Sequence, residues 1–269
     1  MLDIVCPSGL KGTVRQLTIR EQKEFADDET VATGGLTLAL VDKLWQETTE
    51  LGFYAAGPGG KPKWGDVLQG DIAYIVLAIG VLTHGPKYEF KASCTHCGKS
   101  VPWSVDVWDQ LPIYDLPPEI CAAMAAGTKL FDAKTKDGTP IKFQHLRGSH
   151  AAQIAKIQSD HKEEILSRTS AIRIREVAGI EPTDHRARKE WILDLGFGDL
   201  AYLQEQYDAA SCGVETEIQI TCRKCNKEFD VDLQLGYDFL VRKASFAARK
   251  QKRTRVSRVG SGRHTNDQN

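Results

Sequence analysis

Short runs in which apolar and polar residues alternate recur along the chain, and each such run predicts an antiparallel strand. Pro7, Ser8 and Gly9 lie between the first two runs and favour a tight turn, so we expect the chain to begin with a hairpin. Residues 172–177 are too short for the pattern to assign. The predicted strands cover residues 3–6, 12–19, 88–92, 101–107, 140–146, 214–221 and 228–235.

Longer segments with apolar residues three or four positions apart predict helices between these strands. Residues 66–83 leave little polar face, which predicts a buried helix that ends at Gly85 and Pro86. Thr183 or Asp184 is expected to cap a later helix. The predicted helices cover residues 36–51, 66–83, 118–126, 151–167, 184–195 and 199–211, the last capped by Asp199 and stopped by Gly213, and a loop covers residues 57–62.

The order strand, helices, strand, Cys-x-x-Cys, strand occurs twice along the chain. Gly12 lies 82 residues before Cys94, and Gly138 lies 84 residues before Cys222, within similar Gly-Thr segments. We therefore predict an α+β fold of antiparallel hairpins with packed helices, built from two pseudo-repeated halves. The predicted parts are an N-terminal half, a C-terminal half and a basic tail, covering residues 1–126, 127–240 and 241–269.

The two Cys-x-x-Cys pairs have matching surroundings, YEFKASCTHCGKSVPWSVDV and TEIQITCRKCNKEFDVDLQL. Each pair lies between predicted strands and is followed by Gly98 or Asn226, which tolerate a positive φ. A tight turn of this kind directs backbone N–H groups at two sulfurs and presents both sulfurs to one metal. Zinc takes four ligands in structural sites, so each half is expected to supply two. The predicted structural Zn²⁺ ligands are Cys94, Cys97, Cys222 and Cys225.

The sequence supports other roles for these cysteines less well than a zinc site. A redox pair usually opens a helix, whereas both pairs here run into predicted strands. An iron–sulfur cluster could use the same four ligands, although the strand–turn–strand frame favours zinc. His96 is expected to point away from the metal. The remaining cysteines are expected to be small buried residues, and the other histidines to be surface or hydrogen-bonded residues, namely Cys6, Cys121 and Cys212 with His145, His150, His161 and His185.

The charges of the chain are distributed unevenly. Over 269 residues the net charge is only −1, but residues 241–269 hold nine Lys or Arg and one acid, Asp267. This tail can bind either an acidic protein surface or the phosphates of a nucleic acid. The residues proposed for partner binding are Arg242, Lys243, Arg249, Lys250, Lys252, Arg253, Arg255 and Arg258.

The sequence carries no motif typical of an enzyme, a secreted protein or a membrane protein. GxSxG, GxxxxGK[ST] and GxGxxG are absent, and four thiolates around one metal leave no open position for catalysis. We therefore expect no catalytic residues. The apolar run of residues 72–82 is about half as long as a membrane span, and no secretory signal opens the chain.

Four blocks of the sequence resemble the baseplate hub and hub-assembly proteins of T-even-type contractile-tail phages. The last block is the most specific, because it combines a glycine, an acidic strand and a Cys-x-x-Cys pair. The basic tail departs from the family pattern, in which shorter members end soon after an aromatic-rich close. The blocks are PSGLKGTVRQLTIRE, GDIAYIVLAIGVLTHGPKYEFKASCTHCG, TKDGTPIKFQHLRGSH and CGVETEIQITCRKCNKEFDVDL.

The resemblance implies a non-enzymatic role in a phage tail baseplate, with contacts to the central hub and to other baseplate or tail proteins in a multimeric assembly. It implies a location in the virion tail baseplate and, during assembly, in the host cytoplasm. Two alternatives stay open at this point. One is a zinc-ribbon nucleic-acid-binding protein that uses the basic tail, which we consider less favoured because the body of the chain is acidic. The other is a transient assembly chaperone that is absent from the finished virion.

Overall fold

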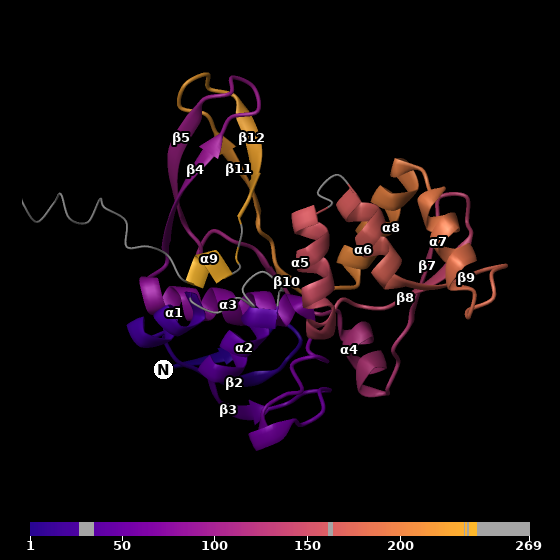
Figure 1. Cartoon of the computed structure of the whole chain (residues 1–269), viewed down its shortest axis with the longest axis horizontal. Coiled ribbons are helices and arrows are strands. Elements are labelled where there is room, and N and C mark those ends of the chain that lie inside the picture. The colour runs from indigo at the N-terminus through magenta and orange to yellow at the C-terminus, as the bar shows by residue number, and fades with distance from the viewer. Residues whose placement is uncertain (27–34, 161–163, 234, 236, 241–269) are drawn as a thin grey trace, which may run out of the picture.

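The computed structural model describes residues 1–26, 35–160, 164–233, 235 and 237–240. Helices and small antiparallel sheets alternate along these residues, which confirms the predicted α+β class. Figure 1 shows a body rich in helices from which a group of strands projects as an arm. The main core draws residues from both predicted halves, so the division of the chain near residue 126 stays a prediction.

The N-terminal sheet has the order β1-β2-β3 and begins with the expected hairpin. Two backbone hydrogen bonds close its turn, from Cys6 N–H to the Leu10 carbonyl and from Gly9 N–H to the Cys6 carbonyl. The second strand is shorter than predicted and ends at Val14. The strands of this sheet are β1 (Leu2–Val5), β2 (Lys11–Val14) and β3 (Trp45–Glu50).

The predicted helix over residues 36–51 is wrong in its second part. Helix α2 (Gly35–Leu44) ends at Leu44, and the chain continues directly as β3. Trp45 is fully buried, pairs with Val14 in the sheet and meets the Trp64 ring edge-on at 5.4 Å between ring centroids. Pairing with β2 therefore overrides the helical spacing, which by chance continues past Leu44.

Helix α3 (Gln69–His84) is the central element of the body, as the apolar run predicted. It contacts α2, β1, β2, β10 and α9, and Gly85 ends it with φ 81°. Before it come α1 (Ile19–Ala26) and the one-turn helix η2 (Pro58–Gly60), which lies within the expected loop. Its buried residues are Asp71, Ile72, Ile75, Val76, Leu77, Ala78, Ile79 and Gly80.

Residues 118–209 form a second group of helices around the sheet β7-β8-β9 (Figure 1). The predicted helix over residues 151–167 is two helices, and the unassigned residues 172–177 include the last strand of the sheet. Strand 140–146 is shorter than predicted and ends at Phe143. The elements are α4 (Pro118–Ala125), β7 (Phe131–Lys134), β8 (Pro140–Phe143), η3 (Gly148–His150), α5 (Ala151–Asp160), α6 (Ile165–Arg173), β9 (Ile174–Val177), α7 (His185–Leu193) and α8 (Phe197–Ala209).

Capping residues were predicted for two helices of this group, α7 and α8. Asp184 caps α7, because its carboxylate accepts a hydrogen bond from Ala187 N–H at 2.9 Å. The caps predicted for α8 are wrong: the helix begins at Phe197, which leaves Asp199 inside the first turn. Gly213 does not stop α8 but begins a strand. An acid in the first turn still favours the helix through its dipole.

The predicted strand over residues 214–221 is broken into two. Strand β10 (Gly213–Val214) pairs with β6 (Ile113–Tyr114), and β11 (Glu217–Thr221) pairs instead with β12 (Glu228–Asp232) in the arm. The chain thus leaves the body through β10 and enters the arm within three residues. The alternation of apolar and polar residues could not show that β10 and β11 pair with different strands, because both strands keep the same two-residue period.

Helix α9 (Tyr237–Leu240) anchors the base of the arm to α3. Phe239 is fully buried, and its ring lies where a side chain on Gly80 would be, with 1.9 Å from an ideal Cβ at Gly80 to the Phe239 Cε1 atom. The ring also meets Tyr88 of the arm edge-on at 5.4 Å between centroids. His84 contacts the Leu240 carbonyl at 2.6 Å through Nε2. The contact with Phe239 explains why α3 has a glycine among its large apolar residues.

Asp71 is a fully buried carboxylate that joins three separate segments. It accepts hydrogen bonds from the Ser8 N–H at 3.1 Å, from the Ser8 hydroxyl and from the Tyr54 hydroxyl at 2.6 Å. Burial raises the pKa of Asp71, and these donors act in the opposite direction. The sulfur of Cys212 lies 3.9 Å from the same carboxylate. Asp71 therefore ties the first turn of the chain to α3 and to the start of β10.

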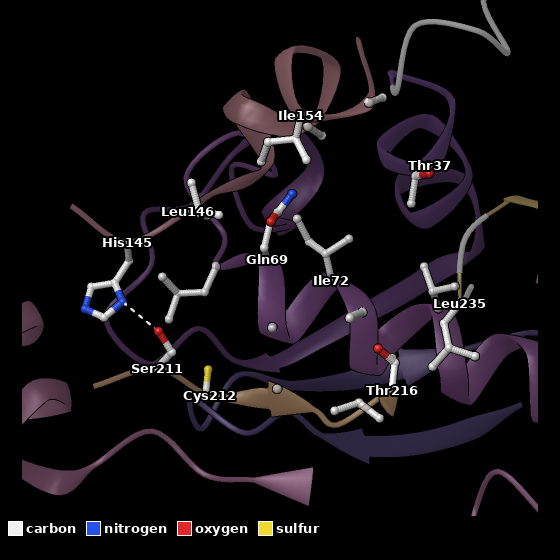
Figure 2. A pocket seen from close by; sticks show the side chains of 18 of the residues that line it. Thr37, Gln69, Ile72, His145, Leu146, Ile154, Ser211, Cys212, Thr216 and Leu235 are labelled. Atoms are coloured by element: carbon white, nitrogen blue, oxygen red, sulfur yellow. Dashed lines mark hydrogen bonds between the residues drawn. The ribbon is translucent and has the colours of Figure 1, made fainter. Parts of the chain in front are cut away.

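His145 is buried in the second half, so of the two expected environments, surface or hydrogen-bonded, it has the second, through one ring nitrogen. Its ring packs edge-on against Phe131 and Phe143, with centroids 4.7 and 5.4 Å away. Its Nδ1 lies 3.5 Å from the Ser211 hydroxyl, on the wall of a cavity of about 510 Å³ (Figure 2). Its Nε2 has no hydrogen-bond partner among the described residues.

Replacing Gly80 tests the contact that anchors the arm. Gly80→Ala improves helix propensity, but its methyl group collides with the Phe239 ring, so we expect the free energy of unfolding to fall by about 1–3 kcal/mol. Gly198→Ala is the matched control, because its Cβ would meet only the flexible end of Lys136 at 3.2 Å. Urea denaturation of both variants measures the difference. A stabilising effect of Gly80→Ala contradicts the packing described here.

The burial of His145 predicts a pH dependence of stability. Burial lowers its pKa to about 4, and the nearby charges of Arg173 and Arg147 act in the same direction. The unfolded imidazole, with a pKa of about 6.5, takes up a proton before the folded one does. The free energy of unfolding is therefore expected to fall by roughly 3 kcal/mol as the pH drops from about 6.5 to about 4.

His145→Gln removes this titration while keeping a polar side chain. We expect the variant to lose most of the stability change between pH 6.5 and 4 that denaturation of the wild type shows. His185→Gln is the control, because His185 is exposed. Equal pH profiles for the wild type and the His145 variant contradict the assignment.

Candidate metal centre

The arm consists of two hairpins that come from opposite ends of the chain. The first pairs β4 (Lys87–Ser93) with β5 (Ser100–Asp106), and the second pairs β11 with β12. Figure 1 shows the two hairpins side by side, with both connecting turns together at the end of the arm. Each turn carries one Cys-x-x-Cys pair, so the fold brings the two predicted pairs to one place.

The two turns have the same backbone geometry. Gly98 and Asn226 adopt φ 67° and 56°, as expected from their sequence positions. Their N–H groups donate to the carbonyls of Cys94 and Cys222, which are the first cysteines of the two pairs, at 2.9 and 2.8 Å. Asn226 is the only non-glycine residue with positive φ among the described residues. Both turns are therefore built to place two sulfurs on one side.

The four sulfurs form one compact group. Cys94 and Cys225 sulfurs are 3.7 Å apart, Cys97 and Cys222 sulfurs are 3.8 Å apart, and all four lie within 4.8 Å of one another. A tetrahedral ion with metal–sulfur bonds of 2.3 Å spaces its sulfurs by about 3.8 Å. The donor set and its spacing therefore fit a single tetrahedral metal ion. No disulfide joins these cysteines.

A backbone N–H group approaches the sulfur of the first cysteine in each turn. The N–H groups of His96 and Lys224 lie 3.4 Å from the sulfurs of Cys94 and Cys222. The Lys224 N–H is the largest cause that lowers the pKa of Cys222, to about 6. Because a metal binds thiolate and not thiol, this hydrogen bond reduces the cost of deprotonating Cys222 on binding. Burial and the neighbouring sulfurs act in the opposite direction at Cys225 and raise its pKa to about 11.

A small apolar core lies beneath the sulfurs and is separate from the main core. Its partly buried members include Phe90 and Trp103 of the first hairpin and Ile218 and Val231 of the second. Two-stranded hairpins are only marginally stable alone. Contacts between the two hairpins, among them this apolar core and the shared sulfur group, are therefore needed to stabilise the arm. The buried members are Ala92, Cys94, Val101, Ile220, Cys222 and Phe229.

His96 is not among the clustered ligands, in agreement with its predicted outward position. Its side chain is exposed, and its Nε2 lies 2.9 Å from the Glu228 carbonyl of the other hairpin. The ring therefore adds a second contact between the two turns. The sequence indicated that His96 points away from the sulfurs. It did not indicate the contact with Glu228, because Glu228 lies 132 residues away along the chain.

The other cysteines are less uniform than the sequence indicated. Cys6 is buried as expected, but Cys121 and Cys212 are partly exposed. Burial raises the pKa of the Cys6 thiol above its ordinary range, and the neighbouring Asp71 carboxylate acts in the same direction. The thiols of Cys6 and Cys212 therefore stay protonated. All three cysteines lie apart from the group of four sulfurs. The eight tail residues proposed for partner binding all lie outside the described residues.

The described part of the chain holds no helix that is both long and apolar enough to cross a membrane.

The comparisons with known proteins agree with the resemblance seen in the sequence. The family described as T4 bacteriophage base plate protein matches residues 5–240. This range includes both hairpins of the arm, all four clustered cysteines and every buried residue of the main core except Ile4. Searches of the curated proteins and of the solved structures returned no match. Because the family match spans most of the chain, the chain belongs to the T4 bacteriophage base plate protein family.

Proposed function

We propose that the chain is a non-enzymatic structural component of a contractile phage tail baseplate that contacts the central hub and is stabilised by one structural Zn²⁺. The observation that supports this most strongly is the family match over residues 5–240 together with the closed group of four sulfurs inside that range. A tetrahedral ion bound by four thiolates has no open position for a substrate or water. The metal then serves to hold the arm in shape.

Zinc is the metal that the sulfur spacing favours. A cluster of several irons would hold its cysteine sulfurs farther apart than a single ion does, whereas the closest pairs here are 3.7 and 3.8 Å apart. When bound, Zn²⁺ would supply no chemistry beyond cross-linking Cys94, Cys97, Cys222 and Cys225. The two hairpins already present these residues through matched turns and a shared apolar core.

The proposed cross-link joins cysteines that are far apart in the sequence. The two close sulfur pairs join residues 131 and 125 positions apart. Binding of zinc to small peptides is worth roughly 10–16 kcal/mol at neutral pH, all of which appears as folding free energy. This chain has a large core that does not involve the metal, so we expect its loss to unfold the arm more than the body.

Removing the metal is the direct test of this proposal. Native mass spectrometry of the purified chain is expected to show one zinc per chain, which a strong chelator removes, and no zinc in Cys222→Ser. Cys121→Ser is the matched control, because Cys121 lies outside the sulfur group, and it should retain the metal. A wild-type chain that is folded and metal-free after expression with zinc would refute the zinc site.

The location of the protein separates the structural role from the two alternatives. We expect peptides of the chain in purified virion tails, whereas an assembly chaperone would be absent from them. Removal of residues 241–269 is expected to reduce incorporation into tails without changing the affinity for DNA. If the same truncation instead abolishes a salt-dependent DNA affinity, with a slope near −0.9 for each phosphate contacted, the nucleic-acid alternative is correct.

A further inference from the structure

The end of the arm carries a surplus of positive charge. We define the arm tip as residues 91–103 and 220–229, which contain the two cysteine turns. Its only carboxylate side chain is Glu228. Its five cationic side chains are all exposed, namely Lys91, Lys99, Arg223, Lys224 and Lys227.

These five cations differ from many lysines of the body in having no carboxylate partner. Lys11 pairs with Glu50 at 2.6 Å and Lys43 with Glu24 at 2.8 Å, but no ion pair involves a cation of the arm tip within the described part of the chain. A single unpaired surface lysine is ordinary. Five of them at the end of a projecting element make the tip itself positively charged, although the strands behind it carry carboxylates such as Glu89 and Asp230.

The proposed metal site accounts for only part of this surplus. Four thiolates around one Zn²⁺ carry two net negative charges, which the neighbouring cations partly offset. The five cations exceed these two charges and Glu228 taken together. The remainder is therefore available to an external group of opposite charge.

One of the cations is held in a position suited to a carboxylate. The guanidinium carbon of Arg223 lies 4.8 Å from the centroid of the Trp103 ring. Both residues line a cleft of about 480 Å³ together with Phe90, Pro102 and one acidic residue, Glu89, which forms no ion pair with Arg223. A guanidinium held against a ring keeps its planar donor fork for a carboxylate, and stacked Arg–Trp pairs are enriched at protein interfaces.

We propose that the arm tip is a docking surface for an acidic segment of a partner protein, in which Arg223 binds a carboxylate and the lysines bind neighbouring acidic side chains. A nucleic acid fits less well, because Arg223 already covers the face of Trp103 on which a base would stack. The positions of the five cations do not depend on the proposed function. The charge of the tip with zinc bound, and the identification of the partner as a baseplate protein, rest on it.

A charge-reversal experiment on the full-length, zinc-loaded chain tests the proposal. The probe is a fluorescein-labelled peptide of alternating Glu and Gly, and fluorescence anisotropy at about 50 mM salt measures its Kd. Lys99→Glu combined with Lys227→Glu is expected to weaken binding about tenfold or more. Both residues support the cysteine turns through their backbones and not through their side chains, so zinc content and circular dichroism should not change.

Two further variants distinguish binding at the arm tip from non-specific attraction between the peptide and any positively charged surface. Lys129→Glu combined with Lys189→Glu makes the same charge change on exposed lysines outside the arm, and should alter the Kd less than about twofold. Arg223→Lys keeps the charge but loses the planar fork, and should weaken binding about fivefold.

Four outcomes overturn the proposal. They are no peptide binding by the wild-type chain, equal losses in the tip and control variants, tighter tip-dependent binding of oligothymidylate than of the peptide, and a tip-dependent dimer in sedimentation velocity. None of them affects the proposed baseplate role, which the virion and metal measurements test separately.

Discussion

The meeting of four cysteine sulfurs at the end of the arm is the contact on which the rest of the arm depends. Each hairpin has only two strands, and the apolar core between the hairpins has only a few buried residues, so neither is expected to be stable alone. The proposed metal would fix their mutual position at the far end, while Phe239 and His84 make contacts at the base. With the metal bound, the arm would be held at both ends and would support the side chains at its tip rigidly.

The parts of this account that depend on local sequence could be predicted. The turns at Gly98 and Asn226, the flanking strands and the buried helix α3 follow from short-range patterns, and the structure confirms them. The joining of the two cysteine pairs was also predictable, despite the 124 residues between Cys97 and Cys222. The ligand number of a structural metal supplied that long-range information, because two ligands alone do not complete a site.

The remaining features depend on contacts that no local pattern encodes. The helical spacing before Trp45 continues into β3, and only pairing with β2 reveals the strand. Asp71 resembles an ordinary acid in the first turn of a helix until Ser8 and Tyr54 meet it in the core. The charge surplus of the arm tip was likewise hidden, since its cations are divided between two distant segments and diluted in an acidic body.

X-ray absorption spectroscopy at the zinc edge of the purified chain tests the central claim most directly, because it identifies the metal and its ligands together. The account predicts four sulfur neighbours at about 2.3 Å and no nitrogen or oxygen neighbour in the same shell. Mixed sulfur and nitrogen ligation, or an iron–iron distance at the iron edge, would contradict a zinc ion bound by Cys94, Cys97, Cys222 and Cys225.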